Sequence, residues 1–110
     1  TCALPIYGWK VAEDLDAPRS KITPIERQLS GSIKALRNTK YEVGDHRVQL
    51  NTIVAADGAA ADAIYRSLAT QKPHYAIARQ GDTIFEFVGP NEATEQIKQA
   101  QALLLPADAK

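Results

Sequence analysis

The sequence predicts an α+β fold, in which a four-stranded antiparallel sheet carries two helices on one face and is preceded by a short N-terminal helix. Two observations predict this class. An order of β-hairpin, Gly-Asp turn and amphipathic helix occurs twice, over residues 39–71 and again over residues 74–105. In the first hairpin, apolar and polar residues alternate, which is typical of a sheet with one buried and one wet face. A chain of 110 residues is long enough for one such domain.

The N-terminal part, residues 1–22, is predicted to be an arm. Residues 1–6 lack an initiator methionine and resemble the translated end of a sequencing adapter, so we expect them to be foreign to the protein. The alternatives are a mature secreted chain or a lipoprotein lipidated at Cys2. Trp9 is expected to pin the arm to the body rather than to stack on a ligand. Residues 23–106 form the predicted domain, and residues 107–110 a tail.

The first helix is expected to begin at Thr23-Pro24, where a capping threonine precedes a proline and Glu26 follows. It would bury Ile25 and Leu29 and end near Gly31. An alternative extends this helix through Ile33 and Leu36, but a strand there explains more of the pattern.

The first hairpin folds at Gly44-Asp45, with glycine at the position that needs a positive φ. This register pairs Val43 with His46, Tyr41 with Val48 and Thr39 with Leu50. The predicted buried face is Ile33, Ala35, Thr39, Tyr41, Val43, Val48, Leu50, Thr52 and Val54, and the wet face is Lys34, Asn38, Lys40, Glu42, Arg47, Gln49 and Asn51. Glu42 lies across from Arg47. Arg37 interrupts the alternation, which suggests a bulge.

The second unit begins with Asp57 as a helix cap, followed by the buried stripe Ala61, Ile64, Tyr65 and Leu68. Its hairpin turns at Gly81-Asp82 and pairs Ala78 with Phe85 and Ala76 with Phe87. The Ala/Phe side is predicted to be core, because small and large side chains interdigitate there and no charge is desolvated. The last helix follows Gly89-Pro90-Asn91 and stops before Pro106; its inward residues are Ala93, Ile97, Ala100, Leu103 and Leu104.

This order of elements is similar in architecture to a ferredoxin-like fold. From the second strand onward it reads βαββα, and the first strand would take the place of the missing last one. The predicted sheet is therefore circularly permuted ferredoxin-like, with strand order 1-2-4-3. Such a likeness predicts no function.

Composition and motifs argue against several functions. The formal net charge is zero and the pI is near 6.6, so no positive field draws nucleic acid or an anionic membrane, and no apolar run could span a bilayer. We expect neither a cofactor nor a metal site, because His46 and His74 have no second ligand at metal spacing. No catalytic residue is assigned, and Arg79 with Glu86 is read as a surface ion pair rather than a general base with its partner.

The function predicted from these features is a non-enzymatic binding or protein-interaction domain that uses the open face of the sheet. Its candidate binding residues are Tyr75, Ile77, Arg79, Ile84 and Glu86, and its partner is another protein or a second copy. One alternative is a small-molecule binder or enzyme with a pocket between sheet and helices or at a dimer interface. A second is single-stranded nucleic-acid binding through Phe85 and Phe87. The composition fits a bacterial cytoplasm and an extracytoplasmic location equally, so no localisation is assigned.

Overall fold

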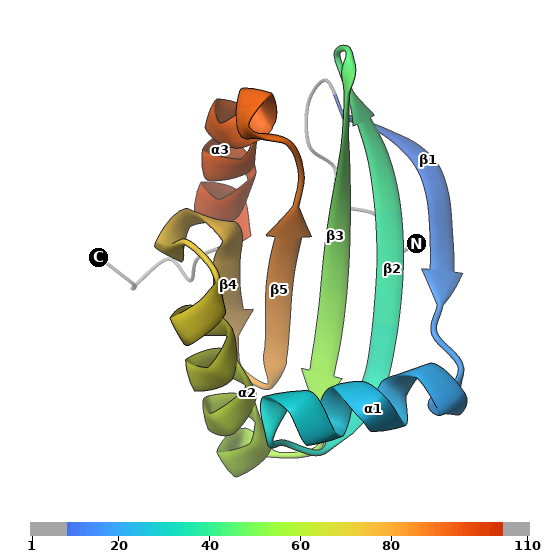
Figure 1. Cartoon of the computed structure of the whole chain (residues 1–110), viewed down its shortest axis with the longest axis vertical. Helices are drawn as coiled ribbons and strands as arrows, with labels where there is room; N and C mark the ends of the chain where they lie inside the picture. Colours follow the sequence, from blue (N-terminus) through green and yellow to red (C-terminus); the bar gives the residue numbers. More distant parts are fainter. Residues whose placement is uncertain (1–8, 105–110) are drawn as a thin grey trace.

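The chain forms a five-stranded antiparallel sheet with helices on both faces (Figure 1). The computed structural model describes residues 9–104. In chain order the elements are β1 (Trp9–Asp16), α1 (Arg19–Leu29), β2 (Ile33–Val43), β3 (His46–Ala55), α2 (Gly58–Gln71), η1 (His74–Ala76), β4 (Ile77–Gln80), β5 (Thr83–Val88), η2 (Asn91–Ala93) and α3 (Thr94–Leu104). The strand order is β1-β2-β3-β5-β4.

Both predicted hairpins are confirmed. Gly44 and Gly81 have φ values of 62° and 61°, the left-handed conformation that these two turns require. The register of β2 with β3 includes all three expected pairs, and Glu42 lies opposite Arg47 at an N···O distance of 3.7 Å. Ala78 pairs with Phe85, whereas Ala76 lies in η1, before β4 begins. The expected neighbours of β3, which are β2 and β5, are also those observed.

The prediction of four strands is wrong, because residues 9–16 of the predicted arm form a fifth strand, β1, on the free side of β2. A β-bulge between Val11 and Glu13 shifts the alternation of β1 by one residue, so the strand lacks the period of two that sequence patterns reveal. The permuted ferredoxin-like sheet of order 1-2-4-3 is corrected accordingly. Trp9, at the start of β1, packs edge-on against Tyr41 and Phe87 with ring centroids 5.2 and 6.0 Å apart, which confirms its predicted pinning role.

The first helix begins four residues earlier than predicted, at Arg19, and Pro24 lies inside it. The proline removes one backbone hydrogen bond from α1, but the added turn buries Ile22. The alternative of a continuous helix through Ile33 is wrong, since α1 ends at Leu29 and Ser30 follows in the left-handed conformation with φ 60°. The bulge expected near Arg37 lies instead between Ile33 and Ala35.

The prediction that two helices cover one face and leave the other open is also wrong. Helices α1 and α2 pack on the face that carries Leu36, Ile53, Ile77 and Ile84. Helix α3 packs on the opposite face, in a cluster that comprises Tyr41, Val43, Val48, Leu50, Ala78, Phe85, Phe87, Ala93, Ile97, Ala100 and Leu104. Each face therefore has its own core, because β4 and β5 carry apolar side chains on both sides and burial of both sets is favourable.

Helices α1 and α2 approach closely at Gly31, in the loop after α1. A Cβ atom at this position would lie 2.7 Å from Cγ1 of Ile64 and 2.9 Å from the carbonyl oxygen of Ala60. Ser67 of α2 adds a hydrogen bond from its hydroxyl to the carbonyl of Leu29, 2.9 Å away. The predictions made for residues 1–6 and 107–110 lie outside the described residues.

Candidate functional site

Two of the predicted binding residues, Ile77 and Ile84, belong to the core. Their relative exposures are 1% and 0%, and both lie beneath α1 and α2. The prediction that Ile77 and Ile84 lie on an open face of the sheet is therefore wrong, because α1 and α2 cover the part of the sheet that carries these side chains. Neither side chain is available to a partner in this structure.

The other three predicted residues are each held by a partner of their own. Arg79 donates to the carboxylate of Asp62 on α2 and, at 2.8 Å, to the carbonyl of Gly81. The hydrogen bond from Arg79 to the Asp62 carboxylate lowers the pKa of Asp62. Tyr75 lies in η1, half-buried against the α3 cluster, with the ammonium of Lys98 5.4 Å from its ring centroid.

Glu86 does not meet Arg79 but ends a row of hydrogen-bonded side chains across three strands. Asn38 donates to Oδ1 of Asn51 at 2.6 Å, and Gln49 donates to the same oxygen at 2.7 Å. Asn51 in turn donates to Glu86 Oε1 at 3.0 Å, and Lys72 lies 3.2 Å from Glu86 Oε2. Because every member is held by its neighbours, this part of the sheet surface is rigid.

Beyond the helices, the same face of the sheet is open to solvent. Figure 1 shows α1 crossing the sheet near one end of β2 and β3, with no described helix in front of the other half of β1, β2 and β3. We call this region the open half-face; the register places on it Lys10, Glu13, Leu15, Asn38, Lys40, Glu42, Arg47, Gln49, Asn51, Glu86 and Val88. All of its members in β2 and β3 were predicted to lie on the wet face.

Several charges of the open half-face are paired within the chain. Glu13 lies 3.2 Å from Lys40, and Glu42 lies 3.7 Å from Arg47. Exposed pairs of this kind add little to stability, about 0–1 kcal/mol each, but they leave a surface with no large field of one sign. A hollow of about 440 Å³ lies between this surface and the start of α1, lined in part by Leu15, Asn38 and Lys40.

Strand β1 forms one edge of the sheet and pairs only with β2, so its outer backbone groups have no strand partner among residues 9–104. Val11 and Leu15 are 43% and 56% exposed, a large fraction for aliphatic side chains. The sequence carries one signal of this edge that the arm prediction overlooked, namely two aliphatic residues spaced among charges in 9–16.

The opposite edge, β4, is short and covered. It spans four residues, and the buried side chain of Gln101 on α3 donates to the carbonyl of Ile77 at 3.1 Å. Gln80, at the end of β4, donates to the carbonyl of Leu104 at 2.6 Å, which ties this edge to the end of α3. Within the described part of the chain, β1 is therefore the edge that is left open to another strand.

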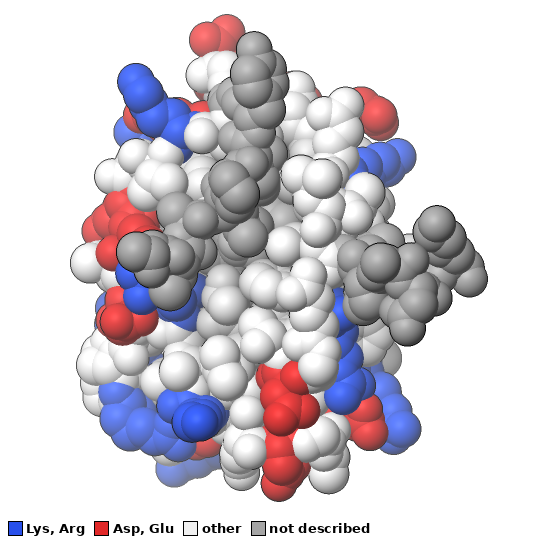
Figure 2. All heavy atoms as spheres, turned by 180° about the vertical axis from the view of Figure 1, so that it is seen from behind, with Lys and Arg blue, Asp and Glu red and all other residues white. Residues whose placement is uncertain are grey.

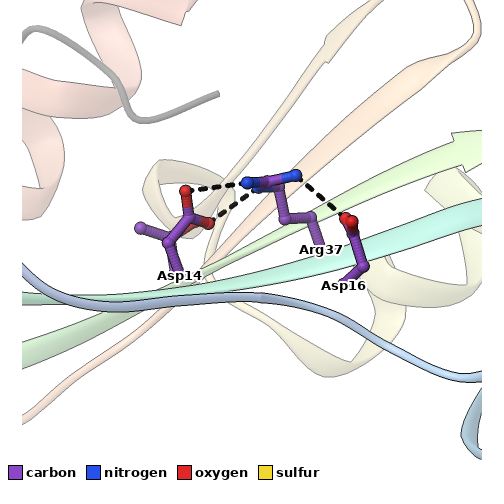
Figure 3. A network of polar contacts seen from close by, with 4 residues as sticks. Asp14, Asp16 and Arg37 are labelled. Carbon is purple, nitrogen blue, oxygen red and sulfur yellow. Dashed lines mark hydrogen bonds and ion pairs between the residues drawn. The ribbon is translucent and has the colours of Figure 1, made fainter. Parts of the chain in front are cut away.

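An ion-pair network on the α3 side of the sheet fixes β1 to β2 (Figure 3). Arg37 donates to both carboxylate oxygens of Asp14, at 2.7 and 3.0 Å, and to Asp16 at 2.9 Å. The Thr39 hydroxyl also donates to Asp14, at 2.9 Å. The hydrogen bonds from Arg37, followed by that from Thr39, hold the pKa of Asp14 below its ordinary value against the opposing effect of burial. These saturated contacts position the strand rather than await a ligand.

The described residues also line a hollow on the helical side of the sheet. A hollow of about 600 Å³ lies between α1 and the start of α2 and is lined mainly by alanine and serine residues, together with Glu26, Arg27 and Asp57. Glu26 is already engaged by Arg19 and by the backbone N–H of Ile33. Within residues 9–104, no three His, Cys, Asp or Glu side chains are grouped as a metal site would need.

The opposite side of the molecule, which carries α3, is seen in Figure 2. Figure 2 shows that Lys, Arg, Asp and Glu lie mainly around the margin of this side, with uncharged residues in the visible middle. Phe85 and Phe87, which suggested base stacking, are buried at 8% and 2% exposure. In the described part of the chain, no helix has both the length and the apolar character to cross a membrane.

The fold and this surface together define a small α+β domain with one covered and one free sheet edge. In comparisons with known proteins, no family model, no curated sequence and no solved structure matches the chain.

Proposed function

We propose that this chain is a non-enzymatic protein-interaction domain that binds through the β1 edge and the adjoining open half-face. One observation carries the proposal: among residues 9–104, the eight-residue edge strand β1, which has exposed aliphatic side chains, pairs with no strand on its outer side, while α3 is hydrogen-bonded to the other edge of the same sheet. Natural sheets rarely leave a long edge bare, and extended segments of other proteins bind such edges by adding a strand.

The open half-face supports the same proposal. An added strand would continue the sheet next to Leu15 and the hydrogen-bonded row that begins at Asn38, where polar groups are already held in place. A rigid, mixed polar and aliphatic surface with balanced charge is similar in composition to interfaces between soluble proteins. It lacks the enclosed, convergent polar site that a small substrate needs.

A binding experiment with matched variants tests the proposal. Immobilised wild-type chain is compared with Val11→Lys/Leu15→Lys and with the control Leu103→Lys, which alters another exposed leucine, on α3. We expect the affinity for a protein that binds the wild-type chain to be about tenfold lower for the edge variant, since one buried leucine contributes roughly 1.5 kcal/mol or more. The control should bind as the wild type does. Equal binding by all three chains would refute the proposal.

A further inference from the structure

No further inference is drawn: the strongest candidate, the outer edge of β1 as a docking surface for one particular partner, carries nothing beyond the proposed function, because the carboxylates of this strand already pair with Lys40 and Arg37 of the same chain and nothing in the described residues shows what covers the edge.

Discussion

Replacement of Gly31 by alanine tests the contact between α1 and α2. The added methyl group would lie 2.7 Å from Cγ1 of Ile64 and 2.9 Å from the carbonyl oxygen of Ala60, whereas ordinary contacts between such atoms begin near 3.5 Å. Ile64 has no exposed surface into which it could turn, and the carbonyl belongs to the backbone of α2. The helix must therefore move away from the loop.

The expected cost is that of overpacking a buried site, about 1–3 kcal/mol. Since 1 kcal/mol changes the Tm of a domain of this size by roughly 4–8 °C, the Tm should fall by roughly 4–24 °C. Gly31 does not have a positive φ, so backbone strain adds nothing to this loss. The free energy of unfolding is measured by urea denaturation, and the Tm by circular dichroism.

Gly58→Ala is the matched control, because a Cβ there would meet only Asp82 Oδ1, at 3.9 Å. This substitution in the first turn of α2 should leave the Tm unchanged or raise it slightly. Alanine lowers the conformational entropy of the unfolded chain, which stabilises the folded state by about 0.4–1 kcal/mol. Equal Tm values for Gly31→Ala and the wild type would refute the reasoning, as they would mean that the two helices are not in contact at this loop.

Three further predictions concern the two cores and the β1 network. Ile84→Glu should abolish the cooperative thermal transition, because it buries a carboxylate under α2. Val88→Glu, at a 42% exposed position on the same face of the same strand, should keep the transition; the reverse result would mean that the helices do not cover the part of the face that carries Ile84. Phe87→Ala should reduce the free energy of unfolding by about 3–5 kcal/mol in urea, and a loss comparable to that of a surface substitution would contradict the packing of α3. Asp14→Asn should destabilise the chain near neutral pH. Because the folded pKa of Asp14 lies below its unfolded value, near 3.8, the stabilisation is complete above that value and is lost as the pH falls through the folded pKa. The difference in unfolding free energy between wild type and variant should therefore shrink below about pH 4; a difference independent of pH would show that the carboxylate of Asp14 is not stabilised by Arg37.

The hairpins could be predicted because their signals are local. Gly44 and Gly81 occupy turn positions that need positive φ, and a turn of known length fixes which residues pair on either side. The neighbour relation of β3 and β5 followed from the similarity of the βαββα order to a ferredoxin-like sheet. None of these inferences depends on where a helix rests in space.

The covering of both faces could not be predicted by the same means. Ile84 and Phe85 are adjacent and both apolar, which indicates a strand buried on two sides, but choosing one face as core required knowing that α3 lies opposite α1 and α2. The partners of Arg79 and Glu86 were missed for the same reason. Asp62 and the C-cap residue Lys72 belong to α2, whose position over the sheet is set by packing and not by spacing in the sequence.

Strand β3 is shared by the two cores. Val48 and Leu50 contribute to the cluster under α3, while Ile53 and Ala55 contribute to the cluster under α1 and α2. Neither hydrophobic cluster can be dismantled without loosening this strand, and loosening it exposes the other cluster as well. The domain should consequently lose both cores in a single all-or-none transition, although they lie on opposite sides of the sheet.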